Sequence, residues 1–473
     1  MRTLEAIVII ANVVVLARLM WMSRGLTKWN AGLAGAAGLL TALQLFTEGF
    51  RWQMVPAYLA LPIIALLILI RPHRVSVSSS WKMRSVKGIL LLLYTAAAVL
   101  PPILVPVFSF GKPTGPYEIG TATYYVRDDD REELYTDDPD DKRELVVQLW
   151  YPSRTGSTES KAPYVAHPAE LAAGLSQTQG FPSFLFGHLG LVTTNARVEA
   201  AVSEQQDAWP LLIFSHGMGS YRNSSTFQFE ELASNGYMIA SIDHTYDAAA
   251  TVLSNGRVAP SLTQIDAGLS LLDSHISLWV EDVQFVMDQL EELNGDHDSP
   301  FYNQMNMSQV GMFGHSYGGA TAMQILMKDD RIKAAINLDG GLYGDLAPDT
   351  GVGKPFMLFN ADETEKYFND AHINESDFPE DTKEILIEIS KRRESALTGG
   401  GYSVTIPGTN HMSFTDFNFF SSLLPSKTHD SLNYHSLTNE ICLLFFDQYI
   451  KEDKKASMNR IVTKYPTINF KQH

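Results

Sequence analysis

A serine between glycines is the first group in the sequence that could do chemistry. Residues 314–318, Gly-His-Ser-Tyr-Gly, have the form G-x-S-x-G, in which glycines permit a strained turn that lifts the serine hydroxyl above a sheet. An apolar run, 309–313, precedes the motif and small residues, 319–322, follow it. The sequence therefore predicts a strand, a sharp turn and a helix, with Ser316 as a nucleophile.

A serine hydroxyl is a poor nucleophile unless a positioned base removes its proton. In hydrolases built around such a turn, the acid and then the histidine follow the serine along the chain. His411 comes directly after a strand-like run, 403–406, and a Pro-Gly-Thr-Asn turn, so we predict it as the base. By chain order, His372, His429, His435 and His473 could also qualify. Of these, His372 and His429 lie in polar, charged surroundings and are expected at the surface.

Two aspartates are candidates for the acid that orients this histidine. Asp339 ends a strand-like run, 334–338, and Asp362 follows the next one, 356–359. Many hydrolases place the acid after the later strand. The residues alone therefore leave both aspartates open.

An anionic intermediate needs at least two hydrogen-bond donors. Residues 214–219, Phe-Ser-His-Gly-Met-Gly, follow an earlier strand-like run and have the form of an oxyanion loop. We predict the backbone N–H groups of Met218 and Tyr317 as the donors. His216 and His315, which flank the two motifs, are expected to be structural.

Short β-branched runs alternate with amphipathic segments from about Tyr117 onward, which indicates a mostly parallel sheet covered by helices on both faces. This is the α/β-hydrolase fold. The clearest helix is 278–293, with a start signal at Asp273-Ser274 and Gly295 just past its end. The expected strands are 145–151, 211–214, 238–242, 310–313, 334–338, 356–359 and 403–406.

The first 110 residues have a different pattern, with four apolar segments at 6–22, 31–46, 55–70 and 89–110. The last three approach or exceed the roughly 20 residues that cross a bilayer. We therefore predict a four-helix transmembrane anchor, 1–110, before a catalytic domain, 111–473. Buried core helices of a soluble domain are the alternative, but the segments have almost no polar face.

Cations in short loops predict the orientation of this anchor, because Lys and Arg accumulate on the cytoplasmic side. They gather at Arg24 and Lys28 and again between Arg71 and Lys87. Both loops should be cytoplasmic. An even number of spans then predicts a multi-pass protein of the cell membrane with its catalytic domain on the extracytoplasmic side.

The first 110 residues hold 2 of the 53 Asp and Glu and 10 of the 36 Lys and Arg. The catalytic domain therefore holds 51 acidic and 26 basic residues and is strongly acidic. This charge argues against nucleic acid as a partner. An acidic insert, 127–142, is expected to be a solvated hairpin tip, since its spacing does not fit a calcium loop. The apolar stretch 169–192 is expected to form a lid over the site or a packing helix.

Several motifs together resemble the secreted, plasma-type platelet-activating factor acetylhydrolase family. The resemblance implies a triad of Ser316, Asp339 and His411, no metal or other cofactor, and action on phospholipids or esters with short or oxidised acyl chains. The anchor and the acidic insert depart from the secreted animal members. The motifs are 147–152 (VQLWYP), 215–222 (SHGMGSYR), 232–237 (LASNGY), 243–244 (DH), 314–321 (GHSYGGAT), 329–333 (DDRIK), 338–339 (LD) and 411–417 (HMSFTDF).

Two other function classes stay open at this point. A general carboxylesterase or polyester hydrolase of the same fold would use Asp362 and bind no phospholipid. A non-enzymatic membrane protein with a decayed hydrolase domain would be expected to lack a triad member, and none is missing. The expected partner is a lipid or small ester substrate, and the sequence does not indicate an oligomeric state.

Overall fold

Two units make up the chain in this computed structural model, which describes residues 1–473 apart from 22–26, 71–79, 264–267, 369–372, 375 and 425–432. The smaller unit comprises Met1–Phe108, Phe184–Val192 and Phe419–Leu424. The larger unit comprises Ser109–Ser183, Thr193–Asn418 and Pro425–His473. The boundary near residue 108 is close to the one expected from the change in hydropathy.

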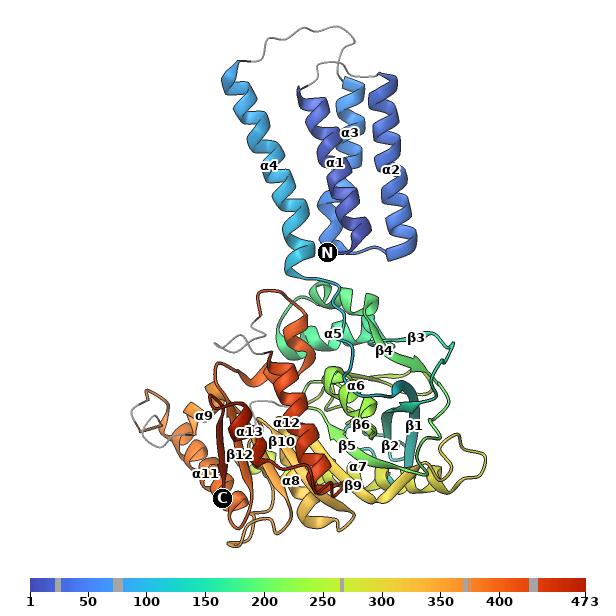
Figure 1. The fold of residues 1–473 in the computed structure, drawn as a ribbon. Helices are drawn as coiled ribbons and strands as arrows, with labels where there is room; N and C mark the ends of the chain where they lie inside the picture. The colour runs from blue at the N-terminus through green and yellow to red at the C-terminus, as the bar shows by residue number, and fades with distance from the viewer. Residues whose placement is uncertain (22–26, 71–79, 264–267, 369–372, 375, 425–432) are drawn as a thin grey trace. The chain divides into compact units, whose positions relative to one another are not determined.

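The larger unit is built on one sheet whose described strands follow the order β13-β12-β11-β10-β9-β5-β6-β2-β1-β4-β3 (Figure 1). The six strands from β6 to β12 in this order are parallel, and antiparallel strands flank them. A separate ribbon pairs β7 (Ala250–Val252) with β8 (Val258–Pro260). The strands of the sheet are β1 (Glu118–Glu132), β2 (Lys142–Ser153), β3 (Lys161–Pro163), β4 (Thr193–Val198), β5 (Trp209–Ser215), β6 (Met238–Asp243), β9 (Met305–His315), β10 (Ile332–Leu338), β11 (Phe356–Ala361), β12 (Tyr402–Ile406) and β13 (Asn469–Gln472).

The sheet is buried on both faces, which explains its nearly continuous apolar strands. Side chains alternate along β5, so Leu212 and Phe214 enter one core while Leu211 and Ile213 enter the other. Helices α6 (Thr226–Ser234) and α12 (Tyr434–Tyr449) cover the first face, and α7 (Leu269–Gly295) and α8 (Tyr317–Lys328) cover the second. This is the predicted α/β-hydrolase architecture. The remaining helices of this unit are α5 (Pro168–Gln179), α9 (Asp362–Tyr367), α11 (Glu380–Leu397), α13 (Asn459–Lys464), η3 (His411–Phe414) and η4 (Asp416–Phe419).

All seven expected strands are present and extend a few residues beyond the predicted bounds. The start of the clearest helix was wrong. Helix α7 begins at Leu269, so Asp273 and Ser274 lie inside it rather than at its start. The Asp273 carboxylate instead pairs with Arg392 at 2.7 Å, and the Ser274 hydroxyl donates to the carbonyl of Leu271 within the helix.

The acidic insert, 127–142, is more structured than a solvated tip. Strand β1 continues through its first carboxylates. The stretch 137–140 is exposed throughout, and Asp129, Asp130, Glu132 and Leu134 are exposed as well. Glu133 is buried against Arg143, with Oε2 and Nη1 3.1 Å apart. Tyr135 folds inward and packs against the cluster that contains Trp279 and Tyr317. The insert is therefore solvated at many positions, as expected, but Glu133 and Tyr135 pack into the larger unit.

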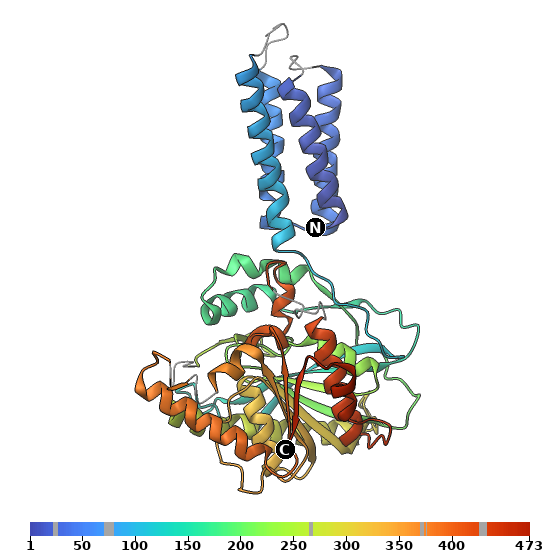
Figure 2. The ribbon, with the colours of Figure 1, turned by 60° about the vertical axis from the view of Figure 1, so that its left-hand side comes forward.

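Among its described residues, the smaller unit has four α-helices that run side by side (Figure 2): α1 (Thr3–Trp21), α2 (Lys28–Glu48), α3 (Val55–Ile70) and α4 (Trp81–Leu104). The short helix η1 (Trp52–Met54) precedes α3. Within the described residues, three helical segments are long and apolar enough to cross a membrane: Thr3–Trp21, Trp52–Ile70 and Trp81–Leu104. Helix α2 is not among them, so the expected count of four spans is not confirmed. The fourth segment was also displaced, because α4 begins at Trp81 and ends at Leu104 rather than spanning 89–110.

The predicted lid, 169–192, falls into two parts. Helix α5 belongs to the larger unit, whereas Phe184–Val192, most of η2 (Ser183–Leu191), belongs to the smaller one. There the ring of Phe184 meets that of Trp52 edge-on, with centroids 5.1 Å apart. This apolar segment therefore packs with the helices of the smaller unit.

Candidate active site

Ser316 stands at a strained turn between β9 and α8. Its backbone has φ 55° and ψ −120°, a conformation that costs a non-glycine residue about 1–3 kcal/mol and is concentrated at functional sites. The Ser316 N–H donates to the carbonyl of Leu338 at 2.9 Å, which ties the turn to the end of β10. The predicted strand, turn and helix are therefore present around the predicted nucleophile.

Two glycines of the motif are required by close backbone contacts. A Cβ atom at Gly314 would lie 2.2 Å from the backbone of Gly318, and one at Gly318 would lie 2.1 Å from the carbonyl of Ser215. Neither contact is compatible with a side chain. The glycines thus allow the turn to close and β5 to approach it.

The structure brings His411 and Asp339 together. His411 opens η3, in the loop after β12, and its Nδ1 donates to Asp339 Oδ2 at 2.7 Å. The Asp339 side chain is fully buried, whereas that of His411 is 44% exposed. Asp339 also accepts from the N–H of Ala361 at 2.6 Å and from the hydroxyl of Thr364 at 2.7 Å. These bonds hold the carboxylate in place beside the imidazole.

Asp362, the alternative acid, has a different set of partners. It opens α9, and its carboxylate accepts from the Gly408 N–H and from Lys366 Nζ, each at 3.2 Å. Its own N–H donates to the hydroxyl of Thr409. Among the described contacts, Asp362 therefore supports the loop that precedes His411 rather than the imidazole itself.

Most of the remaining histidines occupy structural positions. Burial lowers the pKa of His315 to about 3, and its Nε2 donates to the carbonyl of His411 at 2.8 Å. Burial lowers the pKa of His216 to about 4, and its Nδ1 donates to the carbonyl of Gly217. His435 is buried and bonds to the carbonyl of Thr415, while His473 ends the chain after edge strand β13. His372 and His429 lie outside the described residues.

Within the described residues, the backbone N–H groups of the two predicted oxyanion donors have no intramolecular acceptor. Tyr317 is the first residue of α8, a position whose N–H has no acceptor within its own helix. The Met218 N–H has no acceptor among the residues that the structure describes. Gly217 lies directly against the nucleophile, since a Cβ atom there would be 3.0 Å from Ser316 Cβ. The loop that carries Met218 thus reaches the serine.

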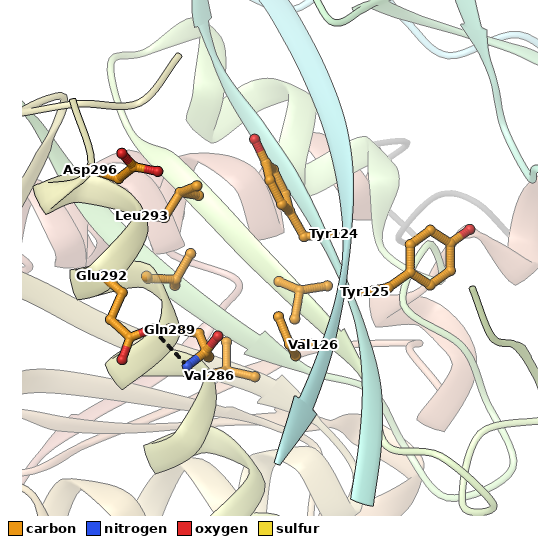
Figure 3. A pocket seen from close by; sticks show the side chains of 10 residues that line it. Tyr124, Tyr125, Val126, Val286, Gln289, Glu292, Leu293 and Asp296 are labelled. Carbon is orange, nitrogen blue, oxygen red and sulfur yellow. Dashed lines mark hydrogen bonds between the residues drawn. The ribbon is translucent and has the colours of Figure 1, made fainter. Parts of the chain in front are cut away.

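A cavity of about 320 Å³ lies elsewhere, between β1 and α7 (Figure 3). Inside it Gln289 Nε2 donates to Glu292 Oε2 at 3.1 Å. Its lining contains no serine or histidine, so the cavity is separate from the candidate site. The part of the chain described contains no cluster of three residues suited to hold a metal ion. The cavity is lined by Tyr124, Tyr125, Val126, Val147, Val286, Gln289, Leu290, Glu292, Leu293 and Asp296.

Comparison with known proteins identifies the family. A family model described as platelet-activating factor acetylhydrolase, isoform II, matches residues 106–266 and 278–453. The chain belongs to this family. Among relatives of this acetylhydrolase family, the platelet-activating factor acetylhydrolase of Cavia porcellus is 26% identical over 388 residues, covering 74% of this chain and 80% of its own. The expected family resemblance is confirmed.

A fungal relative and a solved structure extend the comparison. A probable 1-alkyl-2-acetylglycerophosphocholine esterase of Arthroderma benhamiae is 26% identical over 290 residues, covering 58% of this chain and 71% of its own. The ferulic acid esterase of Streptomyces cinnamoneus matches with a TM-score of 0.59 and 26% identity, covering 77% of this chain and 99% of the esterase. This member of the acetylhydrolase family is therefore a carboxylic ester hydrolase of the serine type. A non-enzymatic membrane protein is excluded.

Sequence reasoning missed some residues that hold the site together. Thr364 donates to the same oxygen of Asp339 that accepts from His411, yet it sits in a run of charged residues, Asp-Glu-Thr-Glu, that has no catalytic pattern. Tyr135 lies 182 residues along the chain from Tyr317 but packs against the same cluster. Only the tertiary structure reveals such contributions.

Proposed function

We propose that this protein hydrolyses lipid esters with a Ser316, His411 and Asp339 triad. The observation that carries the proposal is the 2.7 Å hydrogen bond from His411 Nδ1 to the buried carboxylate of Asp339. The carbonyl of His411 also accepts a hydrogen bond from His315, the residue before Ser316. In such an arrangement the histidine takes the serine proton and the aspartate stabilises the imidazolium that forms. The proposal assigns each residue one role.

The reaction has two halves. Ser316 Oγ attacks the ester carbonyl while His411 Nε2 accepts its proton, and the N–H groups of Met218 and Tyr317 stabilise the oxyanion. His411 then returns the proton to the departing alcohol, which leaves an acyl-enzyme. A water molecule, deprotonated by His411, releases the acid and regenerates the serine. No step requires a metal or another cofactor.

The substrates proposed are short-acyl or oxidised phospholipids and related lipid esters. Two kinds of observation support this choice. One relative is named as an acetylhydrolase of platelet-activating factor, and another as a probable esterase of 1-alkyl-2-acetylglycerophosphocholine. The chain also carries apolar helices that suit a membrane environment. A tether would keep the enzyme with amphiphiles that partition into the bilayer.

A general carboxylesterase is the second candidate function. It is favoured by the similarity to the ferulic acid esterase, whose name describes a substrate that is not a phospholipid. A general carboxylesterase was expected to use Asp362, whereas the hydrogen bond in the structure joins His411 to Asp339. Since Asp339 would then be the acid in either candidate, a comparison of substrates separates them.

We also propose a four-span anchor with the catalytic unit outside the cytoplasm. Polar side chains of α2 are satisfied within the helical unit, as a bilayer requires: Gln44 accepts from the Tyr58 hydroxyl at 2.9 Å, and Thr41 donates to the carbonyl of Ala37 at 2.9 Å. The cations gathered at 24–28 and at 71–87, which lie between helices or in the first turns of α2 and α4, support the orientation.

A fluorophosphonate probe tests the nucleophile directly, because it reacts covalently with an activated serine. Wild-type protein in detergent should be labelled and should hydrolyse p-nitrophenyl acetate. Ser316→Ala should remain folded, judged by an unchanged melting temperature, but lose both signals. Continued labelling of Ser316→Ala would contradict the assignment.

A chain-length series then tests the substrate class. Phospholipids with sn-2 acyl chains of increasing length, a feruloyl ester and simple p-nitrophenyl esters would be compared with and without EDTA. Preference for a short sn-2 chain, unaffected by EDTA, is expected. Activity on simple or feruloyl esters with none on any phospholipid would leave the general carboxylesterase, and inhibition by EDTA would contradict the metal-free mechanism.

A further inference from the structure

A buried carboxylate outside the triad collects hydrogen bonds from several parts of the larger unit. Asp247 Oδ1 accepts from the hydroxyls of Tyr135 at 2.8 Å and Thr263 at 2.6 Å. Its Oδ2 accepts from Trp279 Nε1 at 2.9 Å, and His275 Nε2 lies 3.0 Å from both oxygens. Burial, the strongest single influence, acts to raise the pKa of Asp247, but these donated bonds, led by that from His275, lower it below its usual value. The side chain is therefore an ionised acceptor.

The backbone of Asp247 holds the loop that carries the first proposed oxyanion donor. The Gly219 N–H, one residue after Met218, donates to the Asp247 carbonyl at 2.8 Å. The Asp247 N–H in turn donates to the carbonyl of His244 at 2.9 Å. A displacement of Asp247 would therefore be passed to Met218 through a single hydrogen bond.

The side chains that donate to Asp247 also contact the second proposed donor. Trp279 meets the ring of Tyr317 edge-on, with centroids 5.0 Å apart, and His275 stacks on it at 6.1 Å. The Tyr317 hydroxyl donates to the carbonyl of Leu272 on the same helix, α7, at 2.7 Å. Asp247 thus links α7, and through it Tyr317, to the Met218 loop.

We propose that Asp247 is a positioning residue for the oxyanion hole, and that the acidic insert, 127–142, contributes to it by supplying Tyr135. This inference rests on the proposed function, because it takes the N–H groups of Met218 and Tyr317 as the oxyanion donors. Oxyanion donors act because they are already aimed at the charge that develops in the transition state. A residue that connects both donors therefore acts on kcat rather than on substrate binding.

Tyr135→Phe is the sharpest test, because it removes one hydroxyl and keeps the ring. Tyr237→Phe is a matched control, since the Tyr237 hydroxyl also donates to a carboxylate, Asp447 Oδ1, at 2.8 Å, and none of its described bonds reaches the candidate site. We expect Tyr135→Phe to lower kcat about 3- to 10-fold with KM unchanged, well within the roughly 100-fold cost of misplacing groups by 1 Å. Tyr237→Phe should keep the wild-type kcat.

The affinity for a mimic of the tetrahedral intermediate distinguishes positioning of the oxyanion hole from a purely structural role, because a purely structural role would leave this affinity unchanged. Binding of a trifluoromethyl ketone, whose adduct carries an oxyanion, should weaken in Tyr135→Phe by the same factor as kcat/KM falls. Thr263→Val should act in the same direction, and Asp247→Asn more strongly. If Asp247→Asn fails to fold, the two milder variants still decide the proposal.

The outcomes separate this inference from the proposed function. If wild-type Ser316 is not labelled by a fluorophosphonate, the proposed function fails regardless of Asp247. If the wild type is labelled and active but Tyr135→Phe and Thr263→Val keep the wild-type kcat and ketone affinity, only the positioning role is overturned. The same holds if these variants lose thermal stability without loss of kcat.

Discussion

Asp339 Oδ2 accepts hydrogen bonds from His411 Nδ1 and from the Thr364 hydroxyl, each at 2.7 Å. The three residues come from three separate elements: the end of β10, the loop after β12 and helix α9. The carboxylate is buried, so its orientation depends on these donors and on the Ala361 N–H. This arrangement leads to the first prediction.

Asp339→Asn should lower kcat by on the order of 10⁴, since loss of the charged acceptor disfavours both the required tautomer and the imidazolium. Asp362→Asn, the matched control, should lower kcat by less than about 10-fold, because the described partners of the Asp362 carboxylate are the Gly408 N–H and Lys366 rather than His411. Steady-state hydrolysis of p-nitrophenyl acetate by the two purified variants measures the difference. A larger loss in Asp362→Asn would transfer the acid to that residue.

Gly217→Ala should lower kcat by about 100-fold, because the new methyl group would stand 3.0 Å from Ser316 Cβ and 3.2 Å from His315 Nδ1 and would displace the oxyanion loop. Gly295→Ala is the control: it is the last residue of α7, and nothing lies within 4 Å of a Cβ atom there. Fluorophosphonate labelling rates compare the two. Equal rates in the two variants would show that the loop tolerates the methyl group.

Acid should destabilise the larger unit through its buried imidazoles. Burial lowers the pKa of His435 to about 4, against about 6.5 in an unfolded chain. A histidine with a lowered folded pKa contributes stability that is fully present above pH 6.5 and is lost as the pH falls from there toward 4. Burial acts in the opposite direction on Glu230, whose pKa is raised to about 7, so that carboxyl favours the folded state at lower pH.

His435→Asn isolates one of these groups. Between pH 6.5 and 4 the variant should lose about 3 kcal/mol less stability than the wild type, at about 1.4 kcal/mol per pH unit for one proton. Chemical unfolding of the detergent-solubilised protein at several pH values, followed by tryptophan fluorescence, measures this difference. Parallel pH profiles for variant and wild type would contradict the prediction, because they would show that folding does not shift the pKa of His435.

The sequence predicts most of the fold because the relevant signals are local. Apolar runs predict β5, β9 and β10, and the glycines of the motif permit the strained turn at Ser316. Both signals can be recognised without knowledge of distant contacts. The start of α7 was wrong because Asp273 has the composition of a helix cap but pairs with Arg392, which is 119 residues away. A cap and a tertiary ion pair use the same residue type, so composition cannot separate them.

Local sequence patterns predict part of the candidate site. Ser316 and His411 carry local patterns, whereas Asp339 and Asp362 each follow a strand, and their partners depend on how β10, β11 and the loop after β12 are arranged. Tyr135 and Asp247 have no pattern of their own. Their roles depend on contacts between distant segments, which no periodicity records.

The membrane topology yields the last prediction, and the single cysteine makes it accessible. Cys442 is buried, so new cysteines can be labelled selectively with a membrane-impermeant maleimide. Thr158→Cys, at an exposed position of the larger unit, should be labelled in intact cells. Ser78→Cys, in the cation-rich loop between Arg71 and Lys87, should be labelled only after the cells are permeabilised.

A third position decides whether α2 crosses the bilayer. With four spans, the loop that contains Ser23 lies on the same side as Ser78, so Ser23→Cys should also require permeabilisation. If only the three segments Thr3–Trp21, Trp52–Ile70 and Trp81–Leu104 cross, the two loops lie on opposite sides and their labelling should differ. Labelling of Thr158→Cys only after permeabilisation would invert the orientation, because the larger unit follows α4 directly in the chain.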